Sequence, residues 1–203
     1  MPYNSATHHR RSIRLKGYDY WQAGAYFITI CCQDRKHRFG AIESGQMQLN
    51  DFGTIAHNEW NKLSERFSNF EVDVFQIMPN HMHGIIVLNV GGGGVGAGLA
   101  RAPELNACTI PTPPPTIIGD IAGAYKSIVA NACLQIFKSK YVGVGVNPAG
   151  VGVNPAPAIP LMGKLWQRNY YEHIIRDEKS YQVICSYIIN NPDNWKDDKF
   201  FNQ

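Results

Sequence analysis

Two histidines, His81 and His83, stand one residue apart in the segment QIMPNHMHGIIVL. An apolar run follows them, which predicts that they open a buried strand. Side chains two residues apart on a strand point to the same face, so both imidazoles would project together. Two neutral imidazoles in that arrangement can share one divalent cation. A pair of surface or core-edge histidines without a metal is the alternative that the spacing leaves open.

A metal bound by two histidines needs a further ligand, and the segment YQVICSYIINNP offers one near the end of the sequence. Tyr187 and Asn191 are four residues apart, so a helix would place a phenol and an amide oxygen on one face. Pro192 disfavours helical geometry at Asn191, which leaves the direction of that side chain open. Tyr187 also falls on the apolar stripe of the helix, where it could instead be a packing tyrosine.

Basic and aromatic residues gather in two further segments. HHRRSIRLK, close to the start of the sequence, concentrates positive charge that could follow a phosphate backbone or belong to a solvated terminus. WQRNYYEH, at 166–173, interleaves aromatic rings with cationic and amide groups, which can stack on unpaired bases and hold phosphates. An amphipathic strand with one aromatic face in the core would have the same composition. Lys126 is a further candidate cation, with a solvated lysine as the alternative.

Composition limits the class of protein. The chain has 203 residues, a net charge of +3 and 44% apolar residues, which is ordinary for a folded globular protein. Five cysteines occur without a C-x-x-C pair, so neither a disulfide framework nor a cysteine zinc site is expected. The first residues lack the apolar segment of a secretory signal, and no apolar run is long enough to span a bilayer. A cytoplasmic protein is therefore expected.

The remaining sequence predicts alternating strands and helices. Strands are expected at 25–33, in a hairpin over 38–50 that turns at Ser44 and Gly45, and at 70–78, 83–90 and 165–176. Helices are expected at 50–67 after a cap at Asn50 or Asp51, at 116–140, and from a cap at Asp177 to a stop at Pro192, with a stripe at Val183, Ile184, Tyr187 and Ile188. Hairpins mixed with crossing helices predict an α+β fold, a mostly antiparallel sheet with helices packed on it.

Two segments of biased composition interrupt this pattern, at about 90–115 and 141–160. The first is rich in glycine and then proline, and the second contains GVGVNPA twice. Neither can bury much apolar surface, so both are expected to be flexible insertions in a single domain over 1–203. GGGGVG has the spacing of a dinucleotide-binding loop, but prolines follow it where that loop needs a helix, and the sequence contains no P-loop.

Three segments taken in order, PNHMHGIIVL, LWQRNYYEHIIRD and YIINNPDNW, resemble the single-tyrosine HUH transposases, and most of all the REP-associated tyrosine transposase branch. The H-x-H pattern alone is weakly specific, whereas its combination with the other two segments is strongly specific. The resemblance covers about 10–195, apart from the two insertions. It implies a ferredoxin-like α+β sandwich with the H-x-H pattern on a central strand.

For the site, the resemblance implies that His81 and His83 bind a divalent metal, Mg²⁺ or Mn²⁺, that Asn191 is the third ligand and that Tyr187 is the nucleophile. Transposon-encoded relatives commonly have glutamine where this chain has Asn191, so asparagine matches the REP-associated branch better. The implied reaction is the cleavage and rejoining of single-stranded DNA near hairpins through a covalent 5′-phosphotyrosine intermediate. That link conserves bond energy, which is consistent with the missing P-loop.

The implied partner is a single-stranded DNA hairpin at a repeat or element end, and the protein would bind it as a monomer or homodimer. The expected location is the cytoplasm, at the nucleoid, and no association with a membrane is expected. The residues predicted to contact DNA are Arg10, Arg11, Arg14, Lys16, Lys126, Gln167, Arg168, Glu172, His173 and Arg176.

Two other functions remain open at this point. The first is a non-catalytic DNA hairpin-binding protein derived from a transposase; loss of Tyr187 or of either histidine would favour it, and all three are present. The second is a metallohydrolase with the H-x-H pattern in a larger barrel. Barrels run to about 250 residues and need further metal ligands along the chain, and this sequence meets neither condition.

Overall fold

A computed structural model describes residues 23–67, 69–89, 117–142 and 162–201. The strands are β1 (Gly24–Cys31), β2 (Gly40–Glu43), β3 (Gln46–Leu49), β4 (Phe70–Met78), β5 (His81–Leu88) and β6 (Tyr171–Ile175). The helices are α1 (Asp51–Asn61), α2 (Ile118–Val142) and α3 (Glu178–Asn190), with 3-10 turns at Gln33–Arg35, Lys62–Glu65 and Trp195–Asp197. The expected insertions lie outside the described residues, apart from the last two residues of α2.

Four antiparallel strands form the main sheet in the order β4-β5-β1-β6. Leaving aside the β2–β3 hairpin, the chain runs strand, helix, strand, strand, helix, strand before α3. This connectivity with this strand order is the ferredoxin-like arrangement. The predicted α+β fold with a mostly antiparallel sheet is confirmed, and β5, which carries both histidines, lies at the centre of the sheet.

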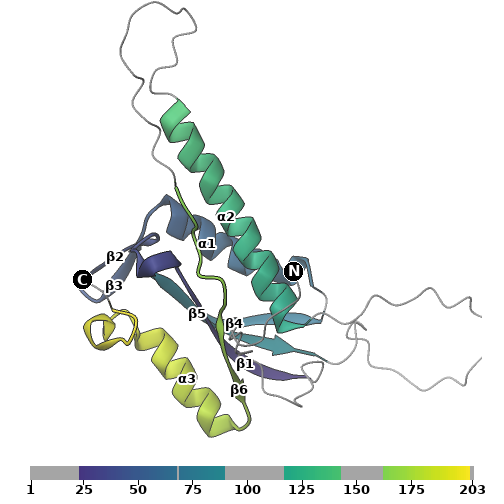
Figure 1. Ribbon diagram of the computed structural model, residues 1–203. Coiled ribbons are helices and arrows are strands. Elements are labelled where there is room, and N and C mark those ends of the chain that lie inside the picture. The colour runs from purple at the N-terminus through teal and green to yellow at the C-terminus, as the bar shows by residue number, and fades with distance from the viewer. Residues whose placement is uncertain (1–22, 68, 90–116, 143–161, 202–203) are drawn as a thin grey trace, which may run out of the picture.

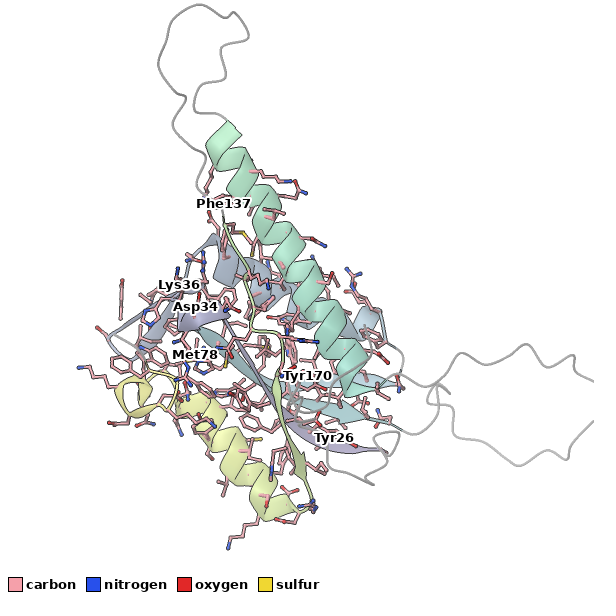
Figure 2. All side chains as sticks on the ribbon, viewed as in Figure 1. Tyr26, Asp34, Lys36, Met78, Phe137 and Tyr170 are labelled. Atoms are coloured by element: carbon pink, nitrogen blue, oxygen red, sulfur yellow. The ribbon has the colours of Figure 1, made fainter. Side chains whose placement is uncertain are left out.

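The two faces of the sheet are covered by different helices (Figure 1). α1 and α2 pack on one face, around the fully buried side chains of Trp60, Tyr125 and Ile28. α3 packs on the other face, where Cys185 and Ile188 contact Ile85. The space between the sheet and the helices is filled with side chains (Figure 2). The described part of the chain contains no helix that is long and apolar enough to cross a membrane.

Local signals in the sequence account for several boundaries. The Asn50 side chain accepts hydrogen bonds from the backbone N–H groups of Phe52 and Gly53, both at 3.0 Å, and so caps α1 as predicted. The helix is shorter than expected, because it tightens into a 3-10 turn after Asn61. Ser44 and Gly45 form the predicted hairpin turn with φ values of 51° and 76°, the sign that a two-residue type I′ turn requires.

Two strands of the structure differ in detail from the strands that the sequence predicts. The alternation in β4 is broken by a bulge between Val72 and Phe75, so Val72 packs on the α1 side while Val74 packs on the α3 side. The strand expected at 165–176 is reduced to β6 and one isolated bridge between Trp166 and Cys32. Between the bridge and β6, the backbone carbonyls of Gln167 and Arg168 accept hydrogen bonds from Lys126 on α2. They are therefore not available for hydrogen bonds between strands.

The orientation of α3 places Tyr187 at the edge of the packed face. Asp177 caps the helix as predicted, because its Oδ1 accepts a hydrogen bond from the Ser180 N–H at 2.8 Å. The predicted stripe is wrong at Val183, which is 62% exposed, since the face that packs on the sheet contains Cys185 instead. This rotation leaves Tyr187 38% exposed and turned towards the histidines.

Gly84, which directly follows His83, leaves space for the side chains of Trp60 and Phe75 on the α1 side of the sheet. A Cβ built on Gly84 would meet Trp60 Cζ2 at 2.8 Å and Phe75 Cβ at 3.3 Å. We expect Gly84→Ala to destabilise the fold by about 1–3 kcal/mol, because the buried indole cannot yield without repacking. Urea unfolding measures the change.

The matched control is Gly123→Ala on α2. Its Cβ would meet nothing within 4 Å, and the residue is exposed in the middle of a helix. Alanine is a better helix former than glycine, so this variant should gain about 0.5–1 kcal/mol. Equal stability of Gly84→Ala and the parent protein would contradict the packing account.

Candidate metal centre and nucleophile

The imidazoles of His81 and His83 lie side by side on β5. Both project from the sheet face that α3 covers, and their ring centroids are 4.4 Å apart. Both residues are 0% exposed. The strand therefore brings the two rings together as the spacing predicts, but at a buried place and not at the surface.

Each ring is held through its Nδ1 atom. His81 Nδ1 lies 2.8 Å from Asn80 Oδ1, and His83 Nδ1 lies 2.8 Å from Thr29 Oγ1 on β1. The Nε2 atoms are left to face the site. His81 Nε2 is buried and has no hydrogen-bond partner among the described residues. His83 Nε2 lies 3.2 Å from the Tyr187 hydroxyl.

α3 delivers Tyr187 and Asn191 to these rings from the far end of the chain. Asn191 has φ −60° and ψ −38°, so it keeps helical geometry although Pro192 follows it, and this answers the question that the sequence left open. Asn191 is buried, and its tertiary contacts outweigh the local steric preference. The two side chains consequently keep the alignment of a four-residue helical spacing.

Asp198 joins the site, and sequence reasoning missed it. The Tyr187 O–H donates to Asp198 Oδ2 at 2.8 Å, and Asn191 Nδ2 donates to the same oxygen at 2.7 Å. Ligand atoms of His81, His83 and Asp198 all lie within 4.8 Å of one another, so these three residues could hold a metal ion. No periodicity links Asp198 to Tyr187, because a 3-10 turn after α3 brings it back to the site.

Two buried atoms without hydrogen-bond partners indicate that this group of residues can bind a divalent cation. His81 Nε2 and Asn191 Oδ1 are both buried, and neither has a hydrogen-bond partner among the described residues. The amide oxygen and the unprotonated nitrogen of a neutral imidazole can each accept a hydrogen bond but cannot donate one. His81 belongs to the candidate metal group with Asp198, and the Asn191 amide is hydrogen-bonded to Asp198, so a cation held at this group would lie beside both residues. Imidazole nitrogen with amide or carboxylate oxygen is a ligand set that suits Mn²⁺ and that Mg²⁺ accepts.

The electrostatics of the site favour neutral histidines and a protonated phenol. Burial lowers the pKa of His81 from 6.5 to about 3, and burial together with the neighbouring His81 lowers that of His83. Burial and the hydrogen bond to Asp198 raise the pKa of Tyr187 above 10.0. Burial would raise the pKa of Asp198, but hydrogen bonds from Asn191 and the Phe200 N–H outweigh it and lower that pKa. Asp198 is therefore the anion of the group.

The C-terminal segment closes the site. The Phe200 ring lies against both imidazoles, with centroid distances of 4.7 Å to His81 and 5.7 Å to His83. Trp195 lies 5.9 Å from His81 on another side. These contacts explain why neither histidine has exposed surface. An open cavity of about 330 Å³ lies next to the site, between α3 and the turn after it, and Tyr187, Asn190 and Asp197 are among its lining residues.

The residues predicted to contact DNA are placed at different parts of the fold. Arg10, Arg11, Arg14 and Lys16 lie outside the described residues. Gln167 and Arg168 lie in the segment before β6, and Arg176 follows that strand, exposed. On β6, His173 is exposed on the same sheet face as His83, whereas Glu172 faces the α2 side, with both carboxylate oxygens buried and unbonded among the described residues.

The Lys126 ammonium group, which is partly buried, binds to the protein backbone. Its Nζ donates to the carbonyls of Gln167 at 2.7 Å and Arg168 at 2.9 Å, and a third carbonyl, of Asn169, lies at 3.5 Å. An ammonium group has three hydrogens, so these carbonyls use them all. Lys126 thus supports the segment that leads into β6, and α2 places it on the face opposite to the histidines. Its contact with DNA stays a prediction.

Comparison with known proteins gives one relative along the whole chain. No family model matches. An uncharacterized protein of Haemophilus influenzae (strain Rd) is 40% identical over 206 residues, which cover 98% of this chain and 97% of that protein. The chain belongs to the family of this Haemophilus protein.

Two solved structures are also similar. One is a REP-associated tyrosine transposase bound to a REP hairpin, with 17% identity and a TM-score of 0.48 over 90% of this chain and 74% of that one. The other is a candidate transposase from Deinococcus radiodurans R1, with 15% identity and a TM-score of 0.41 over 87% and 95%. The first bears the family name that the three sequence segments indicate. Both TM-scores are below 0.5, so the fold and the site rest on this chain's own geometry.

The buried histidines predict how stability depends on pH in the metal-free protein. Their pKa values in the fold lie below the unfolded value of 6.5, so unfolding takes up protons at both rings below that pH. The contribution of these two rings to the free energy of unfolding should therefore level off as the pH rises above 6.5, and fall with falling pH below it, with a slope that approaches about 2.7 kcal/mol per pH unit for two rings.

Urea unfolding between about pH 7 and pH 5 in the presence of a chelator measures this slope. The double variant His81→Gln, His83→Gln should lose it, while His57→Gln, at an exposed position of α1, should keep it. A flat profile in the parent protein would contradict the burial of neutral rings.

Proposed function

We propose that the protein is a transposase-like enzyme that cleaves and rejoins single-stranded DNA, with Tyr187 as the nucleophile. The observation that carries this proposal is the 3.2 Å between the Tyr187 hydroxyl and His83 Nε2. A phenol next to a candidate metal-binding nitrogen is what a phosphotyrosine mechanism needs. The three-segment resemblance to REP-associated tyrosine transposases names the same residue.

His81 and His83 are the proposed metal ligands, through their Nε2 atoms. Asn191 is the proposed third ligand, since its buried Oδ1 lacks a partner among the described residues, and the Asp198 carboxylate is the other oxygen within reach. When bound, Mn²⁺ or Mg²⁺ would supply positive charge that polarises the scissile phosphate. The histidines contribute by being neutral, because a neutral imidazole offers a lone pair without first losing a proton.

Asp198 is the proposed acceptor for the proton of the nucleophile. It already accepts the Tyr187 O–H at 2.8 Å, within the reach of about 2.6–3.2 Å that a general base requires. In the proposed step the phenol proton passes to Asp198, the phenol oxygen bonds to phosphorus, and the bond from phosphorus to the 3′ oxygen breaks. The leaving 3′ oxygen takes a proton from water. Reversal of these events rejoins the strand.

The proposed substrate is a single-stranded DNA hairpin with an unpaired flank. The cavity between α3 and the following turn offers room for a nucleotide beside Tyr187. Exposed Arg168, His173 and Arg176, together with the N-terminal cations, are the proposed contacts to the phosphate backbone. Action as a monomer or homodimer at the bacterial nucleoid remains a prediction.

A protein that binds hairpins without cutting them is the second candidate function. The closed site favours it, because neither histidine has exposed surface and Phe200 lies against both rings. A catalytic protein must open this site for the scissile phosphate, whereas a binding protein need not.

The covalent intermediate gives the direct test. The protein is incubated with hairpin-bearing single-stranded DNA and Mn²⁺ or Mg²⁺, then run on a denaturing gel. We expect a DNA-linked band that disappears in Tyr187→Phe, because the phenol oxygen forms the bond to phosphorus. Tyr171→Phe is the matched control; this tyrosine is exposed on β6, in register with Thr29 and hence two strands from His83, and its loss should leave the band.

The other outcomes separate the candidates. A band that survives Tyr187→Phe and is lost in Tyr171→Phe would move the nucleophile to β6. Tight hairpin binding without a band in either metal would contradict the enzyme and support the binding protein.

Phe200 sets the access to the histidines, and its removal should change the rate. Phe200→Ala takes away the ring that covers both imidazoles, so we expect faster adduct formation with hairpin DNA. Phe201→Ala is the control, because Phe201 packs on Trp195 and lies next in sequence. A rate that is the same in both variants and in the parent protein, at equal melting temperatures, would argue against Phe200 as the barrier.

A further inference from the structure

Asn80 is a buried polar residue to which neither the motifs nor the proposed mechanism gives a role. It is 1% exposed and occupies the turn between β4 and β5, just before His81. We infer that Asn80 is a positioning residue, which fixes the tautomer and direction of His81 so that Nε2 presents a lone pair to the metal. This inference rests on the proposed metal site and concerns a residue that does not itself touch the ion.

Every polar atom of the Asn80 side chain is accounted for. Nδ2 donates to the Phe200 carbonyl at 2.8 Å and to the Arg35 carbonyl at 3.2 Å. Oδ1 lies 2.8 Å from His81 Nδ1. A backbone carbonyl can only accept, so a flipped amide would set its oxygen against two other oxygens. The two carbonyls therefore fix which end of the amide faces the histidine.

The orientation of the amide decides the tautomer of the imidazole. Oδ1 is an acceptor only, so a hydrogen bond with His81 Nδ1 exists only if Nδ1 carries the proton. In a neutral ring the second nitrogen, Nε2, then has the lone pair. That atom is the one that is buried without a partner among the described residues. Asn80 thus prepares His81 as a ligand before any ion arrives.

His83 is held differently, and the contrast isolates the role of Asn80. Its Nδ1 lies 2.8 Å from Thr29 Oγ1, and a hydroxyl can donate or accept. The Tyr187 O–H is given to Asp198, so the contact between Tyr187 and His83 Nε2 favours a proton on Nε2 in the metal-free protein. Thr29 allows that proton to move to Nδ1 when an ion binds. His81 has one tautomer available, whereas His83 has two.

Two substitutions separate positioning from plain structural support. Asn80→Asp keeps an oxygen acceptor for His81 Nδ1 but removes both donors to the Phe200 and Arg35 carbonyls. Asn80→Leu has a similar volume and removes the acceptor as well. Both should lower the melting temperature, since the buried Phe200 carbonyl and the partly buried Arg35 carbonyl lose this donor. Leu63→Ala is the control for destabilisation alone, because Leu63 is fully buried on the α1 side of the sheet.

Mn²⁺ affinity, measured from the signal of free Mn²⁺ in electron paramagnetic resonance, is the readout on the full-length protein. We expect Asn80→Leu to bind Mn²⁺ about 10- to 100-fold more weakly, the usual effect of losing the partner of a metal-bound histidine. Asn80→Asp and Leu63→Ala should bind with about the parental affinity. Long-range ¹⁵N–¹H spectra of the metal-free protein should show the proton of His81 on Nδ1 in the parent and in Asn80→Asp.

Three results would overturn the inference. The first is equal loss of Mn²⁺ affinity in Asn80→Asp and Asn80→Leu, which would reduce Asn80 to structural support. The second is a metal-free spectrum of the parent with the His81 proton on Nε2. The third is a parent protein that binds no Mn²⁺, which would overturn the proposed metal site together with the role of Asn80. The first two leave the proposed function standing, so the failures are distinguishable.

Discussion

Two acceptor atoms, His81 Nε2 and Asn191 Oδ1, are buried without a hydrogen-bond donor in the described part of the chain. A buried polar group without a partner costs about 1–3 kcal/mol, so a fold that keeps two of them in residues next to Asp198 needs a reason to do so. In the proposed metal site, a cation would supply that reason. The central position of β5, the packing of α3 and the return of the chain after α3 all serve to bring these atoms together.

The segment after α3 has two opposite effects on the site. Asp198 places a carboxylate against the phenol of Tyr187 and the amide of Asn191, which assembles the polar group. Phe200 lies on the imidazoles and removes them from solvent, which lowers the pKa of His81 and keeps the ring neutral. A neutral imidazole can bind a metal without first losing a proton, but an imidazole covered by Phe200 is not accessible to DNA. The same few residues therefore prepare the chemistry and restrict access to it.

Much of this could be predicted from the sequence where the signal is local or periodic. The shared face of His81 and His83 followed from strand alternation, and the pairing of Tyr187 with Asn191 followed from helical spacing. Asp198 and Phe200 could not be found in this way, because only the tertiary return of the chain brings them to β5. Val183 was misplaced since two overlapping stripes fit α3, and contact with Ile85 selected the one with Cys185. The N-terminal cations lie outside the described residues, so their contact with DNA stays a prediction.

Anomalous diffraction at the manganese edge, on crystals grown with Mn²⁺ and without DNA, shows whether the two histidines bind one ion. We expect one anomalous peak at about 2.1 Å from the Nε2 atoms of both His81 and His83, with an oxygen of Asn191 or Asp198 as a further ligand. We also expect the Nδ1 contacts to Asn80 and Thr29 to persist. Crystals with no peak at these histidines, and with a water or a protein donor on His81 Nε2, would contradict the proposed metal site.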